Sequence, residues 1–291
     1  MQKFRFLFLI LLLSAQVKAQ QPVLVSPQWV YEHREDPNQV ILYTGFVIRD
    51  DYNKEHIEGS RFLWPEWLAF NKPEGNMFAP DRKTATRILQ DLGINQDSRI
   101  VICHRGADVT IAARMFMTLE HFGLKGRVSF LNGGMEAWKR AGYPVTDKPA
   151  VFKKGNIELK EESALVDKQY VFNALSNADK VVVDARMKRW YDGDPTGYPR
   201  DGHISGALNI PYPDMIDSTN SFKPVSVLEK NFTSIVPDRN KEVVLYCFIG
   251  QTACVDYVVG RNLGYNMKVY EGSMQEWSRD ANLPMDKTKR D

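Results

Sequence analysis

The chain has 291 residues, of which 43% are apolar and six are Trp, so it can build a packed core and is neither disordered nor fibrous. This length predicts two domains. The formal net charge is only +2 and the basic residues form no stripe, which argues against a nucleic-acid partner.

The N-terminus has the pattern of a secretory signal peptide. Lys3 and Arg5 precede an apolar run over residues 6–13, and small and polar residues follow up to Ala19. We therefore expect a signal peptide at residues 1–19 and a protein exported to the periplasm or the extracellular space. The apolar run is short for a bilayer span, so no stable membrane insertion is expected after cleavage, and an uncleaved anchor is the alternative.

Three cysteines, Cys103, Cys247 and Cys254, are too few for a disulfide framework, and their odd number leaves at least one thiol unpaired. The sequence has no Cys-x-x-Cys and no His/Cys metal spacing, so neither a metal nor an organic cofactor is expected. We interpret Cys254 as a buried filler in a helix.

Four short sequence blocks of the first half recur in the same order in the second half. Their offsets are 141, 147, 144 and 139 residues, a drift that changes in loop length would produce. The matches predict an internal duplication into two domains rather than a solenoid, whose repeats are shorter. The paired blocks are residues 24–30 and 165–171, 56–60 and 203–207, 103–106 and 247–250, and 131–134 and 270–273.

Predicted strands alternate with predicted helices in both halves. In chain order these are a strand over residues 99–102, a helix over 110–122, strands over 181–183 and 242–246, a helix over 253–262 and a strand over 268–270. The alternation predicts an α/β fold of two tandem domains, each with a mostly parallel central sheet flanked by helices. We place the domains at residues 20–146 and 164–291, with a polar linker at residues 147–163.

Cys247 stands where the strand over residues 242–246 ends and the next helix begins. Ligands of parallel sheets bind at the carboxyl ends of strands, and the positive end of a helix favours a thiolate, so Cys247 is the candidate nucleophile. Gly250 lets the loop backbone curl, and Thr252 is either a helix N-cap or a hydroxyl donor to a bound anion. The alternative is that Cys247 is a small, inert core residue.

Four motifs of the second half occur together: Val-Asp-Ala-Arg at residues 183–186, Gly-His-Ile-Ser-Gly-Ala-Leu-Asn-Ile-Pro at 202–211, Cys-x-x-Gly-x-Thr-Ala at 247–253, and Tyr-Glu-Gly-Ser at 270–273 followed by Trp277. With these motifs the chain resembles the two-domain rhodanese family of thiosulfate and 3-mercaptopyruvate sulfurtransferases, over about residues 22–285. The resemblance implies that the C-terminal domain is catalytic and the N-terminal domain is not.

The resemblance also implies a mechanism. A small anionic donor hands a sulfur atom to Cys247, and the resulting persulfide passes it to a thiophilic acceptor such as cyanide or a thiol. Loop N–H groups would stabilise the outer sulfur of the persulfide. The partners would be small molecules, and because the duplication already supplies two packed domains, we expect a monomer. The substrate-binding residues would be Arg186, Arg200, Phe248, Ile249, Gly250, Gln251 and Thr252.

Two arginines carry the expected recognition of the donor. Arg186 resembles the family's anion-binding arginine, and Arg200 resembles a second arginine of the mercaptopyruvate enzymes, because a planar guanidinium suits a carboxylate or sulfonate. The alternatives are a structural ion pair of Arg186 with Asp184 or Glu271, and a solvated surface charge for Arg200.

Two pairs of repeated residues are interpreted as structural. His203 recurs as His56 in the same turn, which indicates packing and hydrogen bonding rather than acid–base catalysis. Trp138 and Trp277 follow the fourth repeated block and are expected in the core.

The chain departs from the family at two places. Phe248 and Ile249 stand where the resemblance leads us to expect basic residues or Gly and Ser, which predicts an apolar wall for a larger or less charged donor. In the first half Cys103 stands at the matching position, but the strand over residues 41–45 has no arginine and Asp108 replaces the loop threonine. We therefore expect Cys103 to be non-catalytic, with a resolving or sulfur-relay thiol as the alternative.

The two cysteine loops lack the residues that two other classes of enzyme need. A Cys-x5-Arg phosphatase needs Arg where this chain has Ala253 and Val109, and a thiol-disulfide oxidoreductase needs a Cys-x-x-Cys motif. A sulfur-binding or scaffold module that keeps the fold but turns over slowly stays open as the alternative function.

Overall fold

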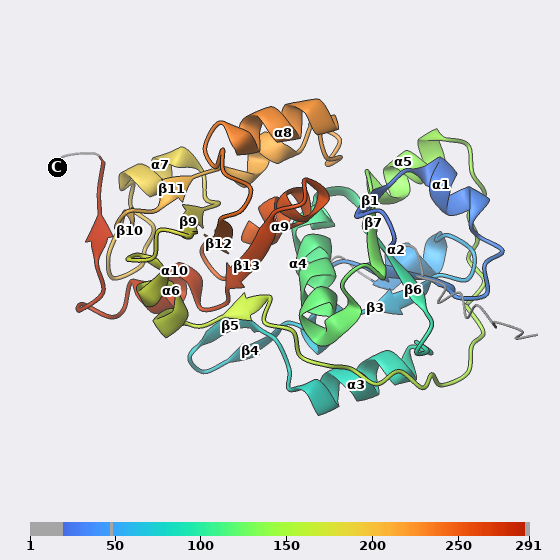
Figure 1. The fold of residues 1–291 in the computed structure, drawn as a ribbon. Helices are drawn as coiled ribbons and strands as arrows, with labels where there is room; N and C mark the ends of the chain where they lie inside the picture. The colour runs from blue at the N-terminus through green and yellow to red at the C-terminus, as the bar shows by residue number, and fades with distance from the viewer. Residues whose placement is uncertain (1–19, 47–48, 289–291) are drawn as a thin grey trace, which may run out of the picture.

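The computed structural model of the protein describes residues 20–46 and 49–288, so the predicted signal peptide lies outside the described residues. Figure 1 shows two α/β units, each built around its own sheet, joined by a long segment without helix or strand. Within the described ranges, no helix is long and apolar enough to cross a membrane.

The first half contains the following elements: β1 (Leu24–Val25), α1 (Pro27–Glu32), β2 (Gln39–Thr44), α2 (Arg49–Lys54), β3 (Arg61–Leu63), η1 (Pro65–Trp67), β4 (Phe70–Lys72), β5 (Gly75–Phe78), α3 (Arg82–Asp91), β6 (Arg99–Cys103), η2 (Gly106–Asp108), α4 (Val109–Leu119), η3 (Glu120–Leu124), β7 (Val128–Leu131) and α5 (Gly134–Arg140).

The second half contains β8 (Leu165–Val166), α6 (Lys168–Ala174), β9 (Lys180–Asp184), α7 (Lys188–Asp192), β10 (His203–Ile204), β11 (Leu208–Asn209), η4 (Tyr212–Met215), α8 (Val225–Thr233), β12 (Glu242–Tyr246), α9 (Ala253–Asn262), β13 (Asn266–Tyr270), α10 (Ser273–Trp277) and β14 (Met285–Asp286).

The two five-stranded sheets have the same topology. The first has the order β1-β7-β6-β2-β3, and the second, read from β8, has the order β8-β13-β12-β9-β11. Every pair of neighbouring strands in both sheets is parallel. The predicted α/β fold with two parallel-sheet units is therefore confirmed, and β6 and β12 are the equivalent central strands.

The predicted strands and helices near the cysteines fall where the structure has them. The Val-rich run of β12 is buried from Val243 onward, as expected for a strand covered on both faces. The helix predicted over residues 110–122 differs at its end: α4 stops at Leu119 and continues as the wider turn η3. Gly123, at φ 84°, has the left-handed conformation that ends a helix and that glycine adopts without strain.

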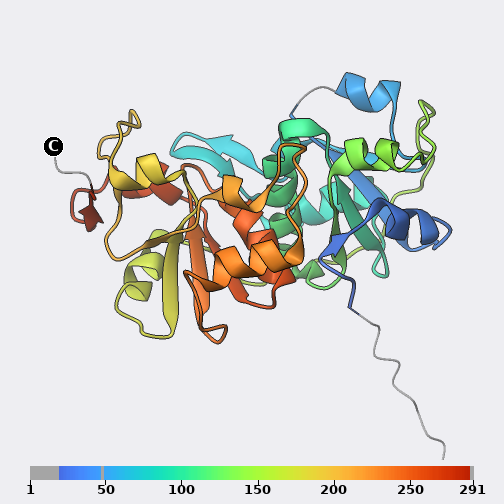
Figure 2. The ribbon, with the colours of Figure 1, turned by 90° about the horizontal axis from the view of Figure 1, so that it is seen from above.

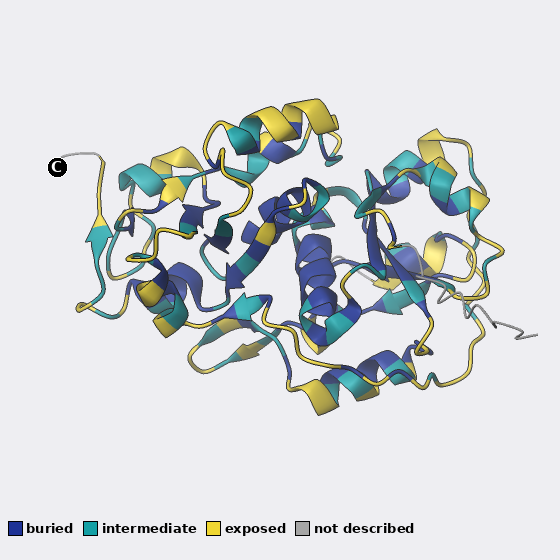
Figure 3. Ribbon diagram, in the orientation of Figure 1, coloured by how far each residue is buried: buried dark blue, intermediate teal, exposed yellow. Residues whose placement is uncertain are grey.

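The two halves share their largest hydrophobic core, and each also has a smaller core of its own. Helices α4 and α9 pack against each other between the two sheets (Figures 1 and 2). Ten of the eleven residues of α4 are buried, and Figure 3 shows this helix as buried along its length. Because nearly every residue of α4 is buried, the helix is covered on all sides, and the N-terminal half supplies an inner wall of the C-terminal half.

Candidate active site

Cys247 begins the loop that connects the central strand β12 to α9. Its side chain is buried, with 1% of the residue exposed. The loop is tied to the start of α10, because the N–H groups of Met274 and Gln275 donate to the carbonyl oxygens of Cys247 and Phe248 at 3.1 and 2.9 Å. The hydroxyl of Ser273 accepts from the N–H of Cys247 at 3.2 Å. These contacts with the start of α10 therefore hold the backbone of Cys247 in place.

The remaining loop backbone is arranged to receive an anion. In the described part of the chain, the N–H groups of residues 248–251 donate to no protein acceptor. Gly250 has φ 73°, and a Cβ there would lie 2.8 Å from the carbonyl oxygen of Glu271, so glycine is required at this position. Thr252 lies at the N-cap of α9 without a side-chain capping bond, which leaves its hydroxyl for another partner. Successive free N–H groups before a helix form an anion-binding concavity.

Arg186 follows β9, the neighbour of β12, and is held rigidly. Its Nε and Nη2 donate to the carboxylate of Asp184 at 2.6–3.1 Å, and Nη2 also donates to the carbonyl oxygen of Gly202 at 2.7 Å. Burial alone would lower the pKa of Arg186, but Asp184, and after it Tyr246 and Cys247, raise it. Nη1 is buried and has no partner among the described residues. The ion pair with Asp184 thus exists, and it leaves one donor available near Cys247.

Phe248 covers this arginine. The guanidinium carbon of Arg186 lies 5.1 Å from the centre of the Phe248 ring. Trp190 packs edge-on against the same ring at 5.0 Å, and Tyr198 lies at 5.8 Å. The apolar wall expected from Phe248 is therefore part of an aromatic cluster, and its neighbours Trp190 and Tyr198 were not identified from the sequence.

The N-terminal half reaches the Cys247 loop through Arg114 of α4. Nη1 of this buried guanidinium donates to the carbonyl oxygen of Gly250 at 3.0 Å, and Nη2 donates to Glu271 at 2.8 Å. The same carboxylate accepts from the N–H of Ala79 at 2.7 Å. A second contact joins the Nε2 of Gln251 to the hydroxyl of Thr110 at 2.9 Å. These residues lie far apart in sequence, and no local pattern singles them out.

The structure places Arg200 away from an anion-binding role. Its guanidinium donates to four backbone carbonyl oxygens, those of Trp277, Ser278, Asp280 and Leu283, at 2.5–3.0 Å. The carbonyl groups of Trp277 and Ser278 end α10, where a cation is favourable, and those of Asp280 and Leu283 lie in the segment that follows. Four of the five N–H groups of Arg200 thus bind backbone carbonyl oxygens, which favours a structural role over the expected donor binding.

The other interpreted residues behave as packing elements. His203 and His56 each have Nδ1 at hydrogen-bond distance from a tyrosine carbonyl oxygen, 2.7 and 2.6 Å away, and each ring stacks on that tyrosine. Trp138 and Trp277 are buried. Cys254 is buried, and its thiol donates to the carbonyl oxygen of Gly250 at 3.3 Å. All five residues therefore support the framework of the two loops.

In the first half, the carboxylates of Asp108 and Glu136 occupy the space around the Cys103 loop where an anion would bind. The N–H of Gly106, which would face an anion, donates to Glu136 at 3.1 Å. Thr44 stands at the strand position of Arg186, and the carboxylate of Asp108 fills the space beside the adjacent Gly45. Burial, and then Glu136, raise the pKa of the Cys103 thiol. These features support the expectation that Cys103 is not a nucleophile.

One buried acid was also missed. Asp256 lies in the first turn of α9, and neither carboxyl oxygen has a hydrogen-bond partner among the residues described. Burial, and then the negative charge of Cys247, raise its pKa well above the usual value. Within the same described residues, no group of His, Cys, Asp and Glu is arranged to hold a metal.

Comparisons with known proteins agree with this geometry. The family described as "Rhodanese-like domain" matches residues 26–141 and 168–280. The sulfur carrier protein TtuD of Thermus thermophilus is 29% identical, with 92% of this chain and 98% of that protein covered. The 3-mercaptopyruvate sulfurtransferase of Escherichia coli K12 is 26% identical, with 91% and 98% covered.

Solved structures show the same fold. The crystal structure of YnjE has a TM-score of 0.81 at 21% identity, covering 92% of this chain and 69% of that one. The crystal structure of the 3-mercaptopyruvate sulfurtransferase SseA from Escherichia coli has a TM-score of 0.74 at 24% identity, covering 87% and 99%. The chain belongs to the rhodanese-like domain family and carries two copies of that domain.

Proposed function

We propose that the protein is a sulfurtransferase that carries a sulfane sulfur on Cys247. The observation that supports this most is the loop itself: Cys247 stands at the carboxyl end of the central strand, and free backbone N–H groups and the N-terminus of α9 surround it. Such donors stabilise negative charge that develops on a bound group. The sulfurtransferase names of several curated relatives point to the same reaction class.

The two proposed half-reactions balance without a cofactor. With thiosulfate as donor, the Cys247 thiolate attacks the outer sulfur, the S–S bond breaks, and sulfite leaves with its electron pair while Cys247 becomes a persulfide anion. An acceptor such as cyanide then attacks the outer sulfur, giving thiocyanate and the Cys247 thiolate. The loop N–H groups bind the outer sulfur, and Nη1 of Arg186 binds an oxygen of the donor.

Phe248 shapes the proposed choice of donor. The ring covers the cation that would attract a small dianion, and it joins Trp190 and Tyr198 in an apolar surface beside Cys247. We therefore expect bulkier persulfides or thiosulfonates to be better donors than thiosulfate.

A sulfur carrier with slow turnover is the second candidate function. It is favoured by the burial of Cys247 and by the likeness to a protein named as a sulfur carrier. In that case the persulfide would form and persist until a protein partner accepts the sulfur.

The test is intact mass spectrometry of the mature protein before and after thiosulfate, 3-mercaptopyruvate and a persulfide donor. A gain of one sulfur atom that cyanide removes, that persists in Cys103→Ser and that is absent in Cys247→Ser supports the proposal. A gain that cyanide removes only slowly supports the carrier. A gain that persists in Cys247→Ser reverses the roles of the two halves, and no gain with any donor contradicts both candidates.

We also propose that the protein is exported and monomeric. Export rests on the charged and apolar pattern of residues 1–19. N-terminal sequencing of protein from cell fractions, and light scattering of the purified protein, test the two points. A cytoplasmic protein that starts at Met1 would contradict export, and a dimer mass would contradict the monomer.

A further inference from the structure

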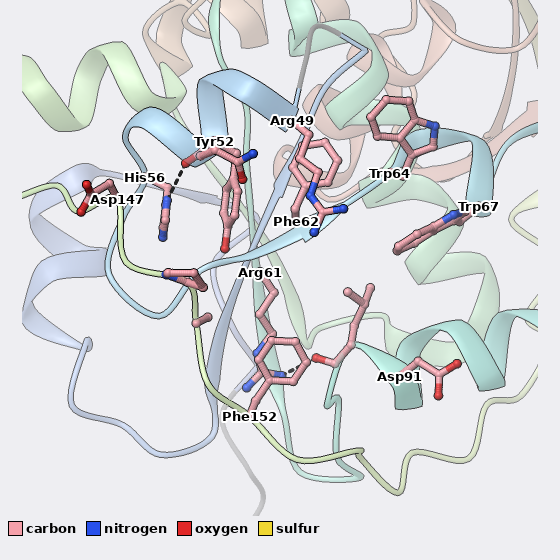
Figure 4. A pocket seen from close by; sticks show the side chains of 14 residues that line it. Arg49, Tyr52, His56, Arg61, Phe62, Trp64, Trp67, Asp91, Asp147 and Phe152 are labelled. Atoms are coloured by element: carbon pink, nitrogen blue, oxygen red, sulfur yellow. Dashed lines mark hydrogen bonds between the residues drawn. The ribbon is translucent and has the colours of Figure 1, made fainter.

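The first half contains a cavity that lies apart from both cysteine loops. It has a volume of about 600 Å³, within the usual range of small-molecule sites. Its lining residues come from α2, β3, η1, the end of α3 and the linker segment over residues 147–152 (Figure 4). The site therefore goes beyond the function proposed for Cys247.

Aromatic rings form much of the wall. Phe62 packs against Tyr52 and Trp64 at 5.6 Å between ring centres in each case, which fixes these three rings as one surface. Trp67 and Phe152 remain 47% and 39% exposed although both line a hollow. Exposed rings that gather in a concave site offer stacking surface to a planar ligand.

Two arginines supply positive charge in the middle of the cavity. The guanidinium carbon of Arg61 lies 4.4 Å from the centre of the Phe152 ring, and its Nη1 donates to the carbonyl oxygen of Leu92 at 2.6 Å. Its Nε is buried and has no partner within the described chain. Arg49 extends from α2 toward the same space (Figure 4).

The acids of the lining do not neutralise this charge. Asp91 pairs with Lys154 at 2.9 Å and with Arg87 at 3.4 Å, outside the lining. Asp147 lies beside His56, on the other side of the view from Asp91 (Figure 4). The centre of the cavity thus combines aromatic faces with unneutralised cations.

We propose that this cavity binds a small planar aromatic anion, with its ring against Trp67 and its carboxylate or sulfonate at Arg49 and Arg61. Arginine binds oxyanions with its planar donors and also stacks on rings, so both parts of such a ligand have a partner. The ligand would contact Phe152 and thus fasten the linker to the first half. Binding is then expected to raise the unfolding temperature, since it favours the folded state.

The experiment uses two matched fluorescent probes with the mature full chain. The anionic probe is 1-anilinonaphthalene-8-sulfonate, and the neutral probe is N-phenyl-1-naphthylamine, which has the same rings without the sulfonate. We expect one sulfonate per chain, bound about tenfold more tightly than the neutral probe, because a charge-assisted hydrogen bond contributes about that factor. The sulfonate should also raise the unfolding temperature.

Variants separate the ring contribution from the charge contribution. Trp67→Ala should weaken both probes, whereas Arg61→Gln should weaken only the sulfonate. Arg49→Gln, at an exposed position, tests the charge again if Arg61→Gln fails to fold. Phe172→Ala removes an exposed ring of α6, in the other half, and should change neither affinity.

Three results would overturn the proposal. One is equal binding of the two probes by the unmodified protein. Another is sulfonate affinity that survives both Trp67→Ala and Arg49→Gln. The third is an equal loss in Phe172→Ala, which would mean that the probe binds to scattered apolar surface.

Discussion

Arg114 in the first half and Gly250 in the Cys247 loop are joined by a hydrogen bond of 3.0 Å from the guanidinium to the carbonyl oxygen. This bond turns the carbonyl group toward the first half, while the N–H groups of the loop stay free for the sulfur. The N-terminal half therefore supports the Cys247 loop of the C-terminal half. Its α4 supplies a buried cation to a loop 136 residues further along the chain.

Replacing Arg114 should affect both stability and chemistry. Arg114→Met leaves Glu271 and the Gly250 carbonyl without their buried partner, so we expect the free energy of unfolding to fall by about 3 kcal/mol. The rate of persulfide formation should fall by about tenfold or more, because one charge-assisted bond positions the loop. Urea unfolding and single-turnover sulfur transfer measure the two effects.

Two further variants give this prediction its controls. Arg114→Lys keeps the charge and should recover part of the rate. Arg87→Met removes a surface ion pair of α3 and should change the free energy of unfolding by about 0.5 kcal/mol or less. Normal loading of Cys247 in Arg114→Met would show that the loop holds its shape without the first half.

Removing the ring that covers Arg186 should change the choice of donor. In Phe248→Ala the guanidinium gains access to solvent, and we expect the rate with thiosulfate to rise by about tenfold, the factor that one new charge-assisted bond provides. The rate with an aromatic thiosulfonate should fall, since its apolar contact is lost. Phe248→Leu keeps an apolar cover and should resemble the unmodified protein. An unchanged ratio of the two rates would contradict a role of Phe248 in donor choice.

The buried carboxyl of Asp256 should weaken the fold at neutral pH. Burial raises the pKa of this carboxyl in the folded protein above its value in the unfolded chain. The contribution of Asp256 to the free energy of unfolding is therefore most favourable below the unfolded pKa, and it is lost as the pH rises toward the folded pKa. Asp256→Val should therefore raise the free energy of unfolding by about 2 kcal/mol at pH 7. The gain should shrink near pH 4, where the unfolded carboxyl is also protonated in part.

Urea unfolding at the two pH values, with sulfur-transfer assays at pH 7, decides whether Asp256 does nothing but lower the stability of the fold. A less stable Asp256→Val would show that the carboxyl has a polar partner in solution. Retained stability with lost transfer would instead give Asp256 a part in the chemistry of Cys247.

His104, the residue after Cys103, should contribute to acid sensitivity. Burial lowers its pKa to about 4, whereas the unfolded chain takes up the proton near pH 6.5. The unfolded state thus binds more protons between these values, and stability is lost as the pH falls from about 6.5 to about 4, by about 3 kcal/mol in total.

His104→Phe should remove this part of the acid loss, because a ring that already packs on Phe130 is replaced by one that does not titrate. Unfolding curves from pH 7 to pH 4 compare the two proteins. Parallel losses in both would assign the acid sensitivity to carboxyl groups instead.

The sequence by itself predicted the duplication and the parallel sheets, which are confirmed, whereas Cys247 as the nucleophile stays a prediction. The strand over residues 242–246 and the helix over 253–262 are confirmed because apolar runs and turn residues act locally. The placement of Cys247 at a strand end follows from the same local pattern. Donor binding by Arg186 remains a prediction, which its free Nη1 supports.

Only the tertiary structure decided what the charged side chains contact. Arg200 binds carbonyl groups 77 to 83 residues away, Arg114 crosses to the other half, and Glu136 enters the Cys103 loop from α5. A long flexible side chain can reach many partners, and burial selects the one that satisfies its hydrogen bonds. That selection depends on how elements far apart in the chain pack, within one half for Arg200 and Glu136 and between the halves for Arg114, and no local run of residues encodes it.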